Sequence, residues 1–173
     1  MIPTLTTDRL ILRAPVMEDA APLAAYLQGP RSATVGGPFP AGEAFDRLCA
    51  LLGHWNLRGY GRWIVADRDS NAALGIVGPY FPMDWPEPEI AWTVFDAAEG
   101  RGIAHEAALA ARDYARAELG WHHPMSAISP SNTRSAALAR RLGCTPEGDF
   151  THPVYGRLDI WRHPEQEVRH GTS

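Results

Sequence analysis

Two glycines interrupt the chain directly before a helical run, in the stretch EGRGIAHEA. Gly100 and Gly102 disfavour regular structure, so their presence indicates positive φ angles or a close approach of another group to bare backbone. A strand that ends in such a loop and opens a helix points free N–H groups and the positive end of the helix dipole at one place. The stretch therefore predicts an anion-binding site, and a tight turn without a ligand is the alternative.

Familiar phosphate and metal motifs do not fit this region. A Walker loop needs Gly-Lys followed by Ser or Thr, but all 16 basic residues of the chain are arginines. The dinucleotide fingerprint needs Gly or Ala at its third small position, which is His105 here. His105 and Glu106 begin a zincin motif, yet that motif requires His where Leu109 stands. His122 and His123 have no third ligand nearby, so no metal site is expected.

Hydrophobic periodicity gives the elements that must hold the loop. Strands are predicted within TLTTDRLILRAP, in two runs on either side of DRDSN, and within EIAWTVF, HPMSAIS and YGRLDIWRHP. EIAWTVF ends immediately before the glycine loop, and a helix over residues 103–119 follows it. The order of these elements predicts a mixed α/β sheet centred on the strand–loop–helix–strand unit, in a single domain of residues 1–173.

Three more helices complete the expected fold. The first lies within MEDAAPLAAYLQGP. The second has one apolar face, formed by Phe45, Leu48, Cys49, Leu52 and Trp55. The third lies within PSNTRSAALARRLGC, where Ser131 or Asn132 is the expected N-cap and Gly143 the expected stop.

Composition narrows the function classes. Apolar residues make up 45% of the chain and charged residues 21%, as in ordinary soluble globular proteins. The net charge of −4 argues against general nucleic-acid binding and mildly favours a cationic substrate. Cys49 and Cys144 have no CxxC spacing, so no disulfide framework is expected. No apolar run is long enough to cross a membrane, and the cytoplasm is the expected location.

The glycine loop and its neighbours resemble the GNAT family of acyl-CoA N-acyltransferases. EGRGIAHEA is similar to the family's pyrophosphate loop, Q/R-x-x-G-x-G/A, with Gly102 and Ala104 at the small positions, and is most like the RimJ/RimL-type branch. TDRLILRAP, GRWIVADRDSNAALGIVG, PEIAWTV and SNTRSAALARRLGC resemble further family segments in the same order. The resemblance covers roughly residues 4–162. It implies a GNAT fold, in which a mostly antiparallel mixed sheet has one splayed parallel pair and about four helices cover it.

The resemblance implies acetyl-CoA as co-substrate and a set of contacts for it. The loop amides and the helix start would bind the pyrophosphate, with Arg101 adding a charge-assisted contact. The strand before the loop would pair through its free edge, at Trp92, Thr93 and Val94, with the peptide-like pantetheine arm. This edge would also supply an N–H near the thioester carbonyl. Asn132 would reach the arm or a phosphate from the next helix start. The full set is Trp92, Thr93, Val94, Gly100, Arg101, Gly102, Ile103, Ala104, Asn132 and Ser135.

The chain departs from the family pattern at three positions. Glu99 stands where the family often has Gln or Arg, so its carboxylate should point to solvent and away from a pyrophosphate. The family's thiolate-protonating Tyr falls on Ala139, and its Phe after LG is Cys144. Because a thiol has a reference pKa of about 8.5, the leaving thiolate depends little on an acid near neutral pH.

Glu89 is the expected general base. RimJ/RimL-like chains commonly have an acid at the equivalent position, and an ammonium must lose a proton before its nitrogen can attack. A solvated strand-end residue or an arginine partner is the alternative for Glu89, and Glu87 is the second candidate base. Ser135 matches the small polar position beside the sulfur, either as a proton donor or as a small residue that admits the pantetheine. Tyr155 is a further candidate donor.

The resemblance implies direct transfer of an acetyl group to a primary amine, either a protein N-terminus or a small molecule. Phe39 and Trp85 lie in segments that border the acceptor side in this family, so with Glu87 they are expected to bind the substrate. Core packing explains the two aromatic residues almost equally well. A non-catalytic acyl-CoA-binding or sensing module is the alternative function, and NTP binding is a third. The expected state is a monomer or a homodimer.

Overall fold

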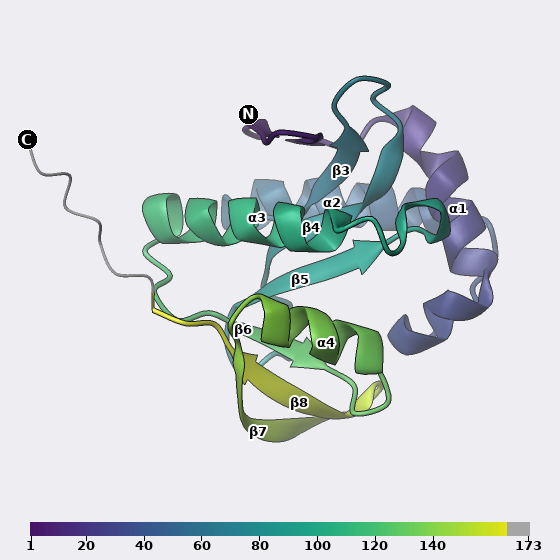
Figure 1. Cartoon of the computed structure of the whole chain (residues 1–173). Helices are drawn as coiled ribbons and strands as arrows, with labels where there is room; N and C mark the ends of the chain where they lie inside the picture. Colours follow the sequence, from purple (N-terminus) through teal and green to yellow (C-terminus); the bar gives the residue numbers. More distant parts are fainter. Residues whose placement is uncertain (166–173) are drawn as a thin grey trace, which may run out of the picture.

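An eight-stranded sheet forms the centre of the molecule (Figure 1). The structure is a computed structural model that describes residues 1–165. The strands are β1 (Leu5–Thr6), β2 (Leu10–Arg13), β3 (Trp63–Asp67), β4 (Ala73–Tyr80), β5 (Glu89–Val94), β6 (Met125–Ile128), β7 (Thr145–His152) and β8 (Gly156–Arg162). Their order in the sheet is β1-β2-β3-β4-β5-β6-β8-β7, and only β5 and β6 run parallel. This confirms the predicted mixed, mostly antiparallel sheet.

Helices cover both faces of the sheet. The α-helices of the described residues are α1 (Ala20–Gln28), α2 (Glu43–Arg58), α3 (Ile103–Leu119) and α4 (Thr133–Arg141). Short 3-10 turns are η1 (Met17–Asp19), η2 (Pro30–Val35) and η3 (Asp96–Ala98). One buried cluster lies between the sheet and α3 with α4, and a second lies between the sheet and α1 with α2. The sheet is therefore the middle layer of three.

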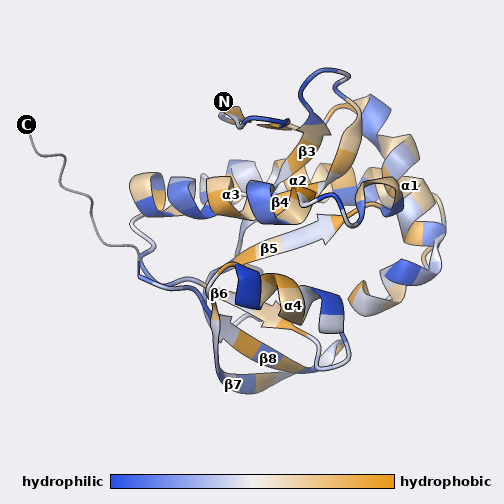
Figure 2. Cartoon of the chain, viewed as in Figure 1, coloured by the Kyte–Doolittle hydropathy of each residue, from blue (hydrophilic) through white to orange (hydrophobic). Residues whose placement is uncertain are grey.

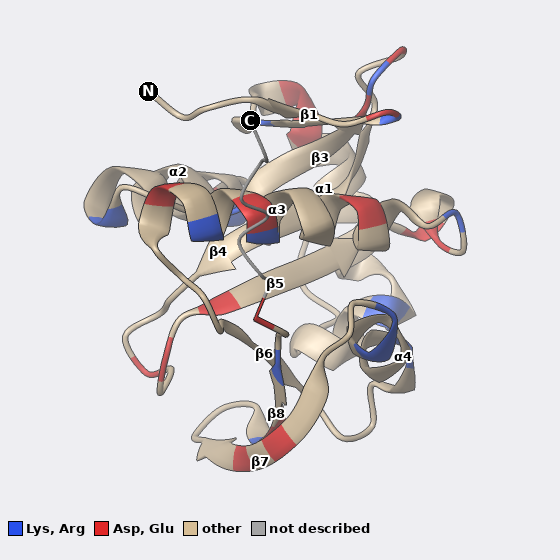
Figure 3. Ribbon diagram, turned by 60° about the vertical axis from the view of Figure 1, so that its left-hand side comes forward, with Lys and Arg blue, Asp and Glu red and all other residues tan. Residues whose placement is uncertain are grey.

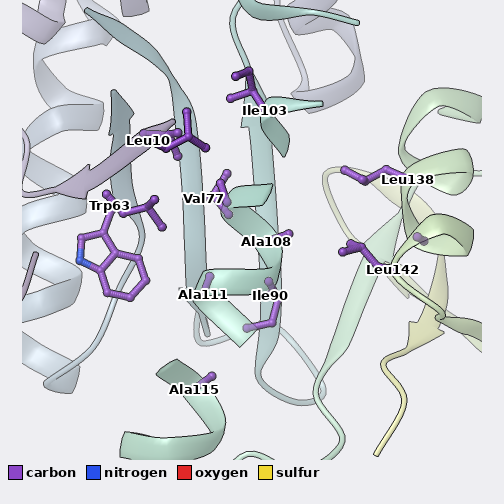
Figure 4. Packing of buried hydrophobic residues seen from close by; sticks show 14 of the residues in the cluster. Leu10, Trp63, Val77, Ile90, Ile103, Ala108, Ala111, Ala115, Leu138 and Leu142 are labelled. Atoms are coloured by element: carbon purple, nitrogen blue, oxygen red, sulfur yellow. The ribbon is translucent and has the colours of Figure 1, made fainter. Parts of the chain in front are cut away.

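Small residues let α3 lie close to the sheet. Ala108, Ala111 and Ala115 of this helix are fully buried and face the strands, with Val77 and Ile90 in the same cluster (Figure 4). Burial of apolar surface drives this packing, and a methyl side chain needs little space between backbones. Figure 2 shows apolar residues along β3 inside the fold and hydrophilic residues on the loop that joins β3 to β4.

The structure corrects the predicted apolar face of α2. Phe45 and Leu52 are exposed, and the buried residues are Ala44, Leu48, Leu51 and Trp55. Both stripes have helical spacing and share two residues, so periodicity alone cannot choose between them. The helix is turned so that Ala44 and Leu51 face the sheet.

Strand β7 was not predicted. Its sequence, TPEGDFTH, contains proline and glycine, and most of its residues are exposed. The strand lies at the edge of the sheet, where Pro146 needs no ladder bond on its open side, and the register shifts between Pro146 and Gly148. Pairing with β8 outweighs a local sequence that is typical of a turn.

Candidate functional site

The parallel strands β5 and β6 are joined at one end. Among the described residues their ladder has a single pair, Glu89 with Met125. Two further hydrogen bonds lie close to it: Ser126 Oγ donates to the Ile90 carbonyl at 2.6 Å, and the Ala127 N–H donates to Glu89 Oε2 at 2.8 Å. Beyond these contacts the strands diverge (Figure 1). The edge of β5 at Trp92 and Thr93 lines a cleft.

Alternation along β5 decides which main-chain groups face this cleft. Along an antiparallel ladder, every second residue bonds to the neighbouring strand. The Phe95 N–H donates to a carbonyl of β4 at 2.9 Å, whereas the Ile90 carbonyl faces β6. The N–H and C=O groups of Trp92 and Val94 therefore face the cleft, and those of Thr93 face β4.

The glycine loop lies where β5 ends. Gly100 and Gly102 have φ angles of 73° and 76°, in the left-handed region, and Gly102 is the N-cap of α3. Within the described part of the chain, the amides from Gly102 to His105 have no acceptor. A Cβ atom at Gly100 would have no atom within 4 Å. The loop thus presents unpaired N–H groups and the positive end of the α3 dipole to open space.

A cavity of about 370 Å³ follows this loop. It is lined by every residue that the sequence suggested for a co-substrate, except Arg101. Arg101 has an exposed side chain, and its carbonyl accepts a hydrogen bond from Arg9 Nη1 at 2.9 Å. The structure therefore brings together the splayed strand edge, the helix start and α4, and it leaves Arg101 outside the cavity.

Arg9 and Glu106 fix the loop to the start of the sheet, and neither was singled out for this from the sequence. The Glu106 carboxylate accepts from Thr7 Oγ1 at 2.6 Å, from the Arg9 N–H at 3.0 Å and from Arg9 Nε at 2.7 Å. Partial burial would raise the pKa of Glu106, but these hydrogen bonds outweigh burial and lower it. The first turn of α3 is held by charge-assisted bonds, so the loop amides keep their direction.

Glu99 is held by two arginines and does not point free into solvent. Its carboxylate lies 3.3 Å from Arg31 and 3.0 Å from Arg134, and all three side chains line the cavity. The basic residues of α4 appear in blue in Figure 3. The negative charge of Glu99 is thus neutralised, and two guanidinium groups lie beside the loop. Arg31 is shared with a second carboxylate, because its Nη1 also donates to Asp96 Oδ1 at 3.0 Å.

A second cavity, of about 470 Å³, adjoins the first along β5. Trp92, Thr93, Asn132 and Ser135 line both cavities, so the two spaces meet at the cleft. The second cavity extends to Glu89 at the beginning of the strand. A ligand that lies along the first cavity can therefore meet a second molecule that enters from the other side.

Glu89 is buried in this second cavity with an exposure of 4%. Trp85 Nε1 donates to its Oε1 at 2.9 Å, and the Ala127 N–H donates to Oε2. Burial raises the pKa of Glu89 to about 7, although the Ala127 N–H, the charge of Arg62 and the Trp85 indole each lower it. A carboxyl group with this pKa exchanges protons near neutral pH, as a general base must.

Ser135 and Asn132 have structural partners as well as a place at the cleft. Trp92 Nε1 donates to Ser135 Oγ at 3.2 Å. Asn132 is the N-cap of α4, and its Oδ1 accepts from the Ser135 N–H at 3.1 Å, which confirms one of the two predicted caps. Both side chains therefore hold the α4 side of the cleft in position.

Of the three residues expected to bind the acceptor, one lines the second cavity and two do not. Trp85 lines the second cavity and contacts Glu89. Phe39 does not line it, but the Arg47 guanidinium, which does, stacks on the Phe39 ring at 4.1 Å. Glu87 lies outside both cavities and forms a two-bond ion pair with Arg162, at 2.6 and 2.8 Å. Its carboxylate is occupied, so the geometry favours Glu89 over Glu87 as a base.

His152 holds the aromatic side chains beside Glu89, and no sequence pattern indicated this role. Its Nδ1 accepts from the N–H groups of Val154 and Tyr155, both at 3.1 Å, so Nε2 is left to donate to Asp84 at 2.6 Å. The imidazole stacks on the Tyr155 ring and meets Trp85 edge-on, both within about 5 Å. One histidine thus fixes two side chains of the second cavity.

Metal binding and nucleophilic chemistry at Cys144 have no support in residues 1–165. No three His, Cys, Asp or Glu side chains of this part of the chain are placed to hold a metal ion. None of its helices is both long and apolar enough to cross a membrane. Burial raises the pKa of the Cys144 thiol to about 11, which makes this cysteine a poor nucleophile.

Comparison with known proteins agrees with this geometry. A family model described as the Acetyltransferase (GNAT) domain matches residues 9–145. An acetyltransferase structure from Agrobacterium tumefaciens is 33% identical, covers 95% of this chain and 96% of its own, and has a TM-score of 0.85. A GnaT-family acetyltransferase from Bordetella pertussis is 28% identical, covers 93% and 99%, and has a TM-score of 0.77.

The fold is also found in a more distant protein with a specified acceptor. A structure described as a ribosomal-protein-serine acetyltransferase from Vibrio cholerae is 21% identical, covers 94% of this chain and 98% of its own, and has a TM-score of 0.77. At this identity the likeness concerns the fold.

Proposed function

The chain belongs to the GNAT acetyltransferase family, and we propose that it transfers an acetyl group from acetyl-CoA directly to a primary amine. One observation carries the proposal: a single cleft joins the unpaired amides at the start of α3 to a buried carboxyl group with a pKa near 7. The first feature suits the pyrophosphate of the co-substrate. The second suits removal of a proton from an ammonium group.

In this proposal the acyl-CoA lies along the first cavity. The amides from Gly102 to His105 would bind the pyrophosphate, and Arg31 and Arg134 would exchange Glu99 for phosphate oxygens. The free main-chain groups of Trp92 and Val94 would pair with the two amides of the pantetheine arm, as one strand pairs with another. Thr93 would contribute its side chain, because its main chain faces β4.

Replacing Glu99 by glutamine is expected to tighten coenzyme A binding about 3- to 10-fold at low salt, because Arg31 and Arg134 lose a competing carboxylate. Titration calorimetry at low and high ionic strength measures the effect, which should shrink with added salt. Equal affinities of the wild type and the variant at low salt would show that these arginines do not contact the phosphates.

On the acceptor side, Glu89 takes a proton from the ammonium group and leaves a nitrogen lone pair. Acetyl-CoA supplies the acetyl group as a thioester. As the new N–C bond forms, the C–S bond breaks, and the second proton of the nitrogen passes to the leaving sulfur, so the products are an amide and free coenzyme A. Of the two N–H groups on this strand edge, at Trp92 and Val94, the one that does not pair with the pantetheine arm would stabilise the negative charge on the carbonyl oxygen.

No tyrosine stands at the family's position for protonating the sulfur, where this chain has the buried Ala139. Two candidate donors from the sequence analysis lie at the cleft: Tyr155 lines the second cavity, and Ser135 lines both cavities. Ser135 Oγ accepts a hydrogen bond from Trp92, which leaves its own O–H able to donate. A thiolate with a pKa of about 8.5 needs little assistance as a leaving group near neutral pH. The absence of the tyrosine therefore does not argue for a non-catalytic binding module.

Release of free coenzyme A thiol from acetyl-CoA, followed with a chromogenic disulfide, tests the proposal against a broad panel of amines. The panel contains amino acids, their amides, polyamines, aminoglycosides and short peptides with free N-termini. We expect amine-dependent release that disappears with Glu89→Gln. Coenzyme binding without release for any amine, and without any effect of Glu89→Gln, would support a sensing module instead.

A further inference from the structure

Two arginines line the second cavity beside Glu89, which we call the acceptor cavity because the amine would bind there. Arg62 lies just before β3, and its guanidinium stacks on the Tyr80 ring at 4.0 Å. Arg47 lies on α2 and stacks in the same way on Phe39. Stacking uses only the flat face of a guanidinium, so the N–H donors in its plane still need acceptors.

Few of these donors have a partner. Nε of both arginines is buried and has no hydrogen-bond acceptor. Within residues 1–165, Arg62 forms no hydrogen bond through its side chain and no ion pair, and Arg47 reaches only Glu43 at 3.7 Å. Burial lowers the pKa of Arg62, and the charge of Arg47 adds to this, although Tyr80 and Glu89 act in the opposite direction. Arg62 is therefore the more poorly solvated of the two cations, since the Arg47 side chain is 35% exposed.

The charge of the cavity is therefore unbalanced. Its charged lining residues are Arg47, Arg62 and Glu89, so two positive groups face a single carboxyl group. A polyamine would bring a second cation toward these arginines, and a protein N-terminus would bring a peptide carbonyl in place of an acid. An anionic group on the acceptor would satisfy the empty donors and remove the imbalance.

We propose that the acceptor is a free amino acid or a closely related amino acid analogue, with its amine at Glu89 and its acid group on Arg62 and Arg47. This proposal rests on the proposed acetyltransferase function and specifies its substrate class. The aromatic residues Tyr80, Trp85 and Tyr155 line the same cavity and suit an apolar side chain. Arg62 and Arg47 act as substrate-binding residues, and the mildly acidic net charge of the chain does not decide the acceptor.

The proposal is tested with acceptors that differ only beside the amine. Phenylalanine, phenylalaninamide and phenethylamine share one side chain, and leucine, leucinamide and isoamylamine form a second series. We expect the acid of each series to have a kcat/KM at least about tenfold above its amide and its amine, as a charge-assisted bond predicts. In Arg62→Met this preference should fall to within about twofold, and Arg47→Met should reduce it in part. Arg58→Met is the matched control, because Arg58 stacks on Phe81 outside the cavity and the preference should remain.

A second measurement does not depend on turnover or on the stability of one variant. N-acetylphenylalanine and N-phenethylacetamide are the corresponding products, and calorimetry in the presence of coenzyme A compares their binding. We expect the acid to bind at least about tenfold more tightly. If amide or amine acceptors match the acids in rate, the acid preference is overturned while the acetyltransferase function stands. If no amine is acetylated and neither product binds, both proposals fail.

Discussion

Replacing Gly100 by aspartate is expected to weaken coenzyme A binding by about two orders of magnitude, because like charges brought together in a binding site cost several kcal/mol. Gly100 lines the first cavity with a φ of 73°, and aspartate tolerates this left-handed conformation better than most residues. Open space surrounds the position, so the new carboxylate would project toward the ligand without displacing the protein. Titration calorimetry with coenzyme A measures the loss.

Gly100→Asn is the matched control. Asparagine has almost the same shape and the same backbone strain at positive φ but no charge, so it should weaken binding only a few-fold. The melting temperatures of both variants show whether the fold survives. Similar affinities for the aspartate and asparagine variants would mean that no phosphate approaches this loop.

Replacing Glu89 by glutamine is expected to lower kcat about 100- to 1000-fold at pH 7.5, the lower part of the range of about 10²–10⁴ that general acid–base catalysis contributes. Because the pKa of Glu89 is about 7, its basic form dominates above neutral pH and is lost below it. The wild-type kcat should therefore fall about tenfold per pH unit below 7, with saturating amine and acetyl-CoA. The variant should lack this limb and keep only the dependence that comes from the amine itself.

Two controls separate catalysis from structure in this experiment. Coenzyme A affinity should stay unchanged in Glu89→Gln, since the residue lies in the second cavity and not in the first. Glu118→Gln, an equivalent change on an exposed part of α3, should leave kcat and its pH profile unaltered. If the Glu89→Gln enzyme keeps the wild-type kcat and its pH profile, Glu89 is not the general base. Its role would then be limited to the structural hydrogen bonds with Ala127 and Trp85.

The glycine loop was predictable because the features that determine its conformation come from residues that are adjacent in the sequence. A strand, two glycines and an amphipathic helix are adjacent in sequence, so the positive φ angles of Gly100 and Gly102 and the exposed helix start follow from composition and order. The parallel pairing of the strands around this helix follows from the same order. The prediction needed no information on distant contacts.

The charged lining of the acceptor cavity depends on contacts that sequence patterns do not contain. Arg47 lies on α2 and Arg62 lies just before β3, and each guanidinium stacks on an aromatic ring from another segment of the chain. Glu89 and Glu87 are two residues apart in one short stretch, but Arg162 of β8 occupies one carboxylate and burial raises the pKa of the other. Tertiary pairing, and not residue type, separates a candidate base from a structural acid.

The edge strand β7 shows the same limit for the fold. Its proline, glycine and acidic residues are typical of a turn, and only the neighbouring β8 makes it a strand. His152 at its end then positions Tyr155 and Trp85 around Glu89. Part of the acceptor cavity therefore depends on an element without a local sequence signal.

A nuclear magnetic resonance titration of the ¹⁵N-labelled protein with coenzyme A tests most directly whether peptide nitrogens at the start of α3 hold the diphosphate. Our account predicts saturable shifts of the Gly102, Ile103 and Ala104 amide signals that are among the largest in the spectrum. It also predicts that pantetheine, which lacks the phosphates, leaves these signals nearly unmoved. Saturable coenzyme binding without shifts at these three amides would contradict it.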